Sequence, residues 1–181
     1  MPALLAGYDE QKIVAIVTAV NGSLAMLTLI AIAWIVDLPL LFPALGPSAF
    51  ILFSEPFARS AAPRSVILGH TIGISVGYAS WQLVSMLTGQ VVSLEQGGWP
   101  ILLSASLAMA VCSTLLIYFS CQHPPSCASA LIVAMGAAST SVAILGMAAG
   151  VLLLTLQATV VNRLVGLKTP IWSPRADDTR M

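Results

Sequence analysis

Charged side chains are scarce in this sequence. Lysine and arginine together number seven, as do aspartate and glutamate, so only 8% of the residues are charged. A soluble domain carries about 25%. With 58% hydrophobic residues and a mean hydropathy of +0.96, the composition excludes an ordinary soluble domain and indicates an integral membrane protein. The net charge of zero gives no basis for nucleic-acid binding.

Cysteines are few, and the common catalytic motifs are missing. Cys112, Cys121 and Cys127 do not make a disulfide framework. Cys121, His123 and Cys127 suggest a metal, but zinc clusters bring four ligands with recognisable spacing. We therefore expect no metal and no cofactor. The apolar stretches contain no Ser–His–Asp set, no H-E-x-x-H motif and no paired carboxylates, so we expect that the chain is not an enzyme.

Four apolar stretches are long enough to cross a membrane. A hydrocarbon core of ~30 Å needs about 20 helical residues. We predict full spans over residues 13–36, 66–88, 99–119 and 142–161. The first stretch lacks a basic lead and is longer than the ~7–15-residue core of a signal peptide, so we expect it to be a span.

Two shorter apolar segments follow proline-containing turns, and we predict half-helices over residues 47–54 and 126–135. The turns are Gly46-Pro47-Ser48 and His123-Pro124-Pro125-Ser126. At membrane depth, irregular backbone is tolerated only where it is buried in protein or lines a cavity. Short, proline-interrupted helices at corresponding places in two halves are also typical of a transporter site. The predicted fold is all-α, with four full transmembrane helices and two half-helices.

The two halves of the chain, about 13–88 and 99–162, share the order of full span, half-helix and full span. Gly46-Pro47-Ser48 aligns with Pro124-Pro125-Ser126, and the second full span of each half carries glycines four residues apart. Such spacing lets helices approach closely in lipid. The predicted packing positions are Gly69, Gly73, Gly77, Gly146 and Gly150. We predict one domain over residues 1–181, a 3+3 inverted repeat, and a homo-oligomer in the lipid bilayer.

The distribution of basic residues bears on topology. If both half-helices and their extended leads cross, there are six crossings, and every basic residue lies on the cytoplasmic side. These are Lys12, Arg59, Arg64, Arg163, Lys168, Arg175 and Arg180. The positive-inside rule favours this arrangement, with both termini cytoplasmic in a bacterial inner membrane. The alternative is re-entrant half-helices, with four crossings and the basic tail opposite the Arg59–Arg64 loop.

Three motifs in order resemble the HPP family of small membrane proteins, over about residues 43–135. They are Pro43-Ala44-Leu45-Gly46-Pro47-Ser48, Pro63-Arg64 followed by Gly69-His70, and His123-Pro124-Pro125 followed by Ala130-Leu131. Members in cyanobacteria and chloroplasts are linked to nitrite transport. The resemblance therefore implies passage of a small inorganic anion, nitrite first and nitrate second. Here Ser126-Cys127 stands where many relatives have a pair such as Ala-Gly.

We expect the anion to bind near the membrane midplane between the two half-helix starts. Each start carries a partial positive charge, and we expect it to present free backbone N–H donors. The predicted substrate-binding residues are Gly46, Pro47, Ser48, His123, Pro124, Pro125 and Ser126. The serines either donate hydroxyls to the anion or cap their own helices. His123 either donates a hydrogen bond or carries a proton, or else it only fixes the turn.

Two further residues are candidates for a pathway or gate. His70 lies about one turn into its span, where it either packs beside Gly69 or acts as an ionisable intramembrane group. Arg64 is either an interface charge or attracts anions at the cytoplasmic mouth. The alternative to transport is a membrane scaffold or partner-binding subunit.

Overall fold

Six α-helices make up the described part of the chain, residues 9–173, in a computed structural model of the protein. They are α1 (Glu10–Val36), α2 (Leu45–Ser54), α3 (Pro63–Thr88), α4 (Trp99–Tyr118), α5 (Pro125–Ala134) and α6 (Ser141–Leu164), with a 3-10 turn, η2, at Arg59–Ala61. No strand occurs within residues 9–173. Each helix lies within three residues of its predicted bounds, because prolines, glycines and isolated charges mark the ends locally.

Three of the long helices, α1, α4 and α6, are apolar enough to cross a membrane. Helix α3 has 26 residues and is long enough, but it is not among these three. The reason lies in its position, since α3 packs against α4, α5 and α6. A helix with so many protein neighbours needs less apolar surface toward lipid. The prediction of four full spans is therefore supported for three helices by length and composition.

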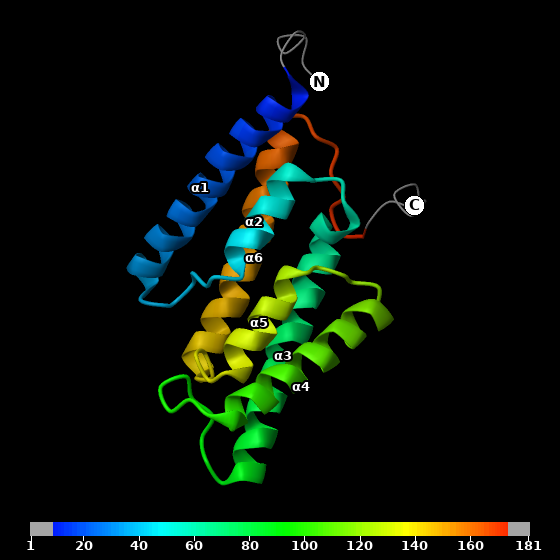
Figure 1. The fold of residues 1–181 in the computed structure, drawn as a ribbon. Helices are drawn as coiled ribbons and strands as arrows, with labels where there is room; N and C mark the ends of the chain where they lie inside the picture. The colour runs from blue at the N-terminus through cyan, green and yellow to red at the C-terminus, as the bar shows by residue number, and fades with distance from the viewer. Residues whose placement is uncertain (1–8, 174–181) are drawn as a thin grey trace.

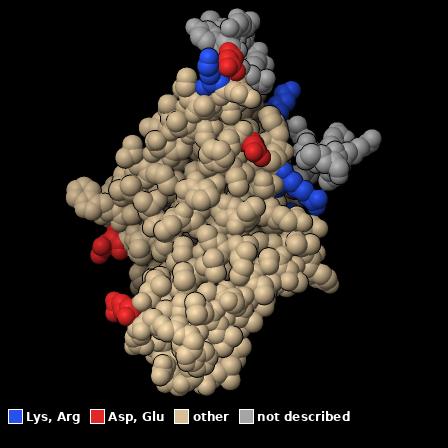
Figure 2. Space-filling model, in the orientation of Figure 1, with Lys and Arg blue, Asp and Glu red and all other residues tan. Residues whose placement is uncertain are grey.

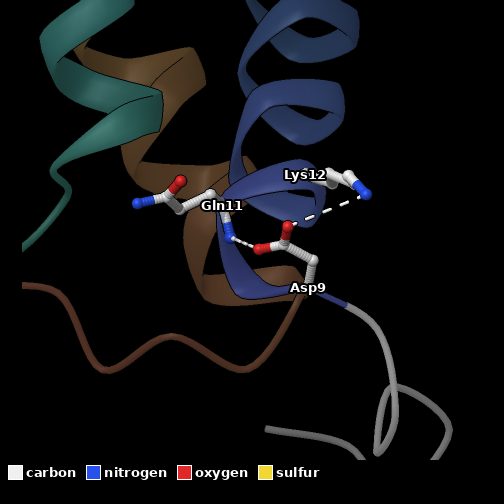
Figure 3. Close-up of polar contacts among 3 residues, drawn as sticks. All are labelled: Asp9, Gln11 and Lys12. Atoms are coloured by element: carbon white, nitrogen blue, oxygen red, sulfur yellow. Dashed lines mark hydrogen bonds and ion pairs between the residues drawn. The ribbon is translucent and has the colours of Figure 1, made fainter.

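Helix α1 begins at a side-chain cap. The Asp9 carboxylate accepts a hydrogen bond of 3.1 Å from the backbone N–H of Gln11 (Figure 3). Such a cap stabilises a helix start by about 1 kcal/mol. Lys12 Nζ lies 3.8 Å from Asp9 Oδ2, but their side chains are 80% and 50% exposed, so this ion pair contributes little.

The two half-helices start side by side and leave in opposite directions. In Figure 1 the chain runs down through α1, up through α2 and down through α3, then up through α4, down through α5 and up through α6. The starts of α2 and α5 lie near mid-height, and the two helices are in contact. Segments without regular structure, residues 38–42 and 121–123, followed by short turns, carry the chain to these starts.

Basic residues gather at one end of the molecule. Figure 2 shows lysines and arginines in the upper part of the molecule. The surface below them is almost entirely uncharged. The backbone N–H of Arg64 donates to the carbonyl of Trp172 over 3.0 Å, so the loop before α3 and the tail after α6 lie at this same end. Arg175 and Arg180 lie outside the described residues.

Polarity is arranged opposite to that of a soluble protein. The outer surface is largely apolar, with Trp34 at 89% exposure and Leu164 at 81%. Several polar side chains are instead at most 1% exposed: Ser48, His70, Ser104, His123, Ser126 and Ser129. Intramembrane polar groups that face a bundle interior are costly and commonly functional, so these buried residues are candidates for a functional site.

The predicted glycine positions are close backbone approaches. A Cβ at Gly73 or Gly77 of α3 would collide with backbone carbonyls of α5. A Cβ at Gly146 or Gly150 of α6 would collide with the carbonyls of Pro39 and Leu40. Gly73 and Gly77 thus lie where the backbones of α3 and α5 approach closely. The α6 glycines contact the segment that leads to α2 instead of a helix, because that half-helix begins only at residue 45.

Candidate functional site

A single hydroxyl joins two histidines where the half-helices meet. Ser48 Oγ, in the first turn of α2, lies 3.0 Å from His70 Nε2 and 2.9 Å from His123 Nε2. It also lies 3.0 Å from the carbonyl of Ala44. The two imidazole rings are tilted at 60° with centroids 5.1 Å apart. The contacts bring together α2, α3 and the turn before α5, segments that are far apart in the sequence.

The far nitrogens of the two rings are also bonded. His70 Nδ1 lies 2.8 Å from Ser129 Oγ on α5, and His123 Nδ1 lies 2.8 Å from the carbonyl of Ser60 in η2. Each imidazole therefore uses both nitrogens inside the protein. We call Ser48, His70, His123, Ser126 and Ser129 the histidine–serine cluster. Since its members are at most 1% exposed, the cluster is closed in this structure.

Ser126 is the member of the cluster with unused hydrogen-bonding capacity. Its hydroxyl is fully buried and has no hydrogen-bond partner among the described residues. It lies beside Gly69, where a Cβ would come within 2.5 Å of Ser126 Oγ and 3.2 Å of His123 Cβ. A buried hydroxyl without a partner costs free energy. Ser126 is therefore the part of the cluster that is best suited to receive a polar guest.

The backbone donors at the two helix starts are already occupied. In α2 the N–H groups of Leu45 and Gly46 donate to Phe42 and Pro43, and Pro47 has none. In α5 Pro125 has none, and the N–H groups of Ser126 and Cys127 donate to His123 and Pro124. The prediction of free N–H donors was wrong, because 3-10 turns lead into both helices. Donors at this junction come from side chains.

The residues predicted to bind substrate are only partly brought together. Ser48, His123, Pro125 and Ser126 are buried at the junction. Gly46, Pro47 and Pro124 are exposed and turned away from the cluster. Gly46 instead lines a cavity between α1 and α2. A helical turn spreads successive side chains by about 100°, so the residues of one motif point to different sides, and some are buried while their neighbours are exposed.

The two candidates for a pathway or gate have different surroundings. His70 is fully inside the cluster and is not simply packed against Gly69. The guanidinium of Arg64 donates to the carbonyls of Ser120, at 3.1 Å, and Phe119, at 3.2 Å. It thereby holds the end of α4, where Ser120 adopts a left-handed φ of 52°. Arg64 thus anchors the segment that leads into His123.

Two further cavities lie among the helices, in addition to the one that Gly46 lines. One of about 320 Å³ lies between α3 and α6 and includes His70, Thr71 and Ser75 in its lining. A larger one of about 630 Å³ lies between α1 and α2 and contains no member of the cluster. Of these two cavities, the smaller one is therefore the one that borders the cluster, through His70.

Sequence reasoning missed Ser129 and the carbonyl of Ser60. Ser129 follows Ser126 by three residues and so lies on the same face of α5, a spacing that was available in the sequence. The carbonyl of Ser60 carries no sequence signal. Its position depends on η2 packing beside α3.

Comparison with known proteins gives one match. A family model described as HPP, transmembrane region, matches residues 9–170. No curated protein and no solved structure matches the chain.

Proposed function

The chain belongs to the HPP transmembrane family, and from this premise we propose that it is a membrane transporter or channel for a small inorganic anion, nitrite first and nitrate second. The anion binds at the junction of α2 and α5, beside Ser126 and the two histidines. The protein acts by transport and not as an enzyme. The observation that carries the proposal is the buried, unpartnered hydroxyl of Ser126 at the start of a half-helix.

Electrostatics at the junction favours a negative guest. Each helix start carries a charge of about +0.5. At ~4 Å and an effective dielectric near 20, the start contributes about 2 kcal/mol to binding of a univalent anion. Two starts contribute about 4 kcal/mol, whereas removing water from the ion costs several kcal/mol. The dipoles alone thus give weak binding, and the hydroxyl of Ser126, which has no partner among the described residues, must supply the rest.

We further propose that the fold is a 3+3 inverted repeat and that both termini are cytoplasmic. The alternating direction of the six helices (Figure 1) supports this arrangement. So does the bond between Arg64 and Trp172, because re-entrant half-helices would separate the Arg59–Arg64 loop from the tail. Asp37 and Ser120, left-handed residues that follow α1 and α4, occupy corresponding places in the two halves.

Cysteine labelling tests this topology in a variant that lacks the three native cysteines. A membrane-impermeant maleimide should modify Arg59→Cys and Lys168→Cys from the cytoplasmic side only. It should modify Gln96→Cys from the opposite side only. Labelling of residues 59 and 168 from different sides would contradict six crossings.

Anion uptake into liposomes tests the function. We expect the purified protein to raise nitrite or nitrate uptake above that of protein-free vesicles, and Ser126→Ala to lower it by at least about tenfold, equivalent to ~1.4 kcal/mol. Because Ser126 Oγ has no partner among the described residues, this substitution should not lower thermal stability.

Thr18→Val is the matched control for Ser126→Ala. Thr18 Oγ1 is also buried without a partner among the described residues, but it lies on α1 and lines the α1–α2 cavities. Its uptake should equal that of the wild type. If the wild type carries neither anion, the transport proposal fails and the scaffold alternative gains support.

A further inference from the structure

The hydrogen bonds around Ser48 fix which nitrogens carry protons. The carbonyl of Ser60 can only accept, so His123 Nδ1 must donate to it over 2.8 Å. In a neutral His123, Nε2 then has a free lone pair and must accept. Its partner at 2.9 Å is the hydroxyl of Ser48, which therefore donates.

The remaining contacts then follow in one direction. Because the Ser48 hydroxyl donates its only proton to His123, its oxygen must accept a hydrogen bond from His70 Nε2 at 3.0 Å. His70 Nδ1 in turn accepts from the hydroxyl of Ser129 at 2.8 Å. Both neutral rings are satisfied by this chain from Ser129 through His70 and Ser48 to His123.

A second acceptor beside Ser48 permits one other arrangement. The carbonyl of Ala44 lies 3.0 Å from Ser48 Oγ. If the hydroxyl proton turns to Ala44, the oxygen presents lone pairs to both Nε2 atoms. His123 Nε2 can then carry a proton of its own and donate it to Ser48. The two arrangements differ by one bound proton, which comes from bulk water, and by rotation of one hydroxyl.

The extra proton would have no carboxylate beside it. Helix α2 holds no ionisable residue, and Glu55 follows its far end. On the other elements packed around the pair, the ionisable groups in the described range that face the junction or flank it are Arg59, Arg64, Cys112, Cys121 and Cys127. The counter-charge of a protonated His123 must therefore come from a guest.

A buried charge without a partner is strongly unfavourable, whether it is the imidazolium or the anion. Each makes the other easier to bind, and thermodynamic reciprocity requires the two effects to be equal. We propose that the histidine–serine cluster binds one proton together with one anion and carries them in the same direction, with the Ser48 hydroxyl switching between His123 and Ala44. This inference rests on the proposed anion transport and adds its coupling ion.

Equilibrium accumulation in liposomes separates coupled from uncoupled transport. Nitrate serves as the anion. If nitrate is not carried, nitrite replaces it, and the leak measured in protein-free vesicles is subtracted. An acid-outside gradient of one pH unit should concentrate the anion about tenfold inside, because one proton enters with each anion. A potential of ~60 mV, inside positive, set by potassium and valinomycin, should change accumulation little. For an anion that moves without a proton, the same potential should concentrate the anion about tenfold inside the vesicles.

His123→Gln tests the residue assignment, since an amide side chain donates and accepts hydrogen bonds but does not bind a proton. We expect this variant to lose accumulation driven by the pH gradient. Ser104→Ala, a buried serine bonded to the carbonyl of Ala134 outside the cluster, should keep it. Accumulation by the wild type that follows the potential and ignores the pH gradient would overturn the coupling while leaving anion transport intact. Coupling retained in His123→Gln would overturn the assignment to His123. Absence of any anion uptake by the wild type would instead refute the proposed function.

Discussion

Gly69→Ala should abolish most anion uptake, although it adds a single methyl group. The new Cβ would lie 2.5 Å from Ser126 Oγ and 3.2 Å from His123 Cβ. These positions belong to a turn and a short helix that pack tightly on α3, so the hydroxyl must move away from the cluster. Overpacking of this kind typically costs about 1–3 kcal/mol. We expect the initial rate of uptake to fall at least about tenfold and the unfolding temperature in detergent to drop.

Gly46→Ala is the informative comparison, because the sequence alone makes Gly46 the stronger candidate for substrate binding. A Cβ at Gly46 meets nothing within 4 Å, and the residue is exposed on the outer side of its turn. Uptake and stability should both match the wild type. If Gly46→Ala were inactive and Gly69→Ala active, the site would lie on the other face of the α2 start.

Ser48→Ala should cause the second large effect, a combined loss of stability and transport. Removal of this hydroxyl leaves His70 Nε2 and His123 Nε2 buried without their shared partner. Each buried polar atom left unpaired costs about 1–3 kcal/mol. We expect the free energy of unfolding to fall by about 2–6 kcal/mol, twice the single-atom cost. Thermal unfolding in detergent measures the first effect, and liposome uptake measures the second.

Ser104→Ala calibrates that loss. Ser104 is as buried as Ser48, but its hydroxyl donates only to the carbonyl of Ala134, over 2.7 Å. One unpaired carbonyl should cost about 1–3 kcal/mol, and uptake should persist. Equal destabilisation by the two substitutions would mean that the histidines readily find other partners, and the cluster would then not be a coupled unit.

The helices could be predicted closely because their signals are local. Prolines start α3, α4 and α5, and isolated charges end the apolar stretches, so the bounds follow from neighbouring residues. The site was predicted less completely. Ser48, His123 and Ser126 were identified from their place at proline turns, whereas Gly46, Pro47 and Pro124 were included because a motif does not say which of its residues face inward.

What the sequence by itself determined is the class of protein, the length of each helix and the two short helices that follow proline turns. These depend on composition and on interactions between near neighbours. Only the tertiary structure decided that His70, Ser48 and His123 form one cluster with Ser129. The bonds that join them link residues 22, 75 and 59 positions apart. Such contacts depend on how α5 packs against both α3 and α2, and periodicity along a single helix identifies a face but not the neighbour that it meets.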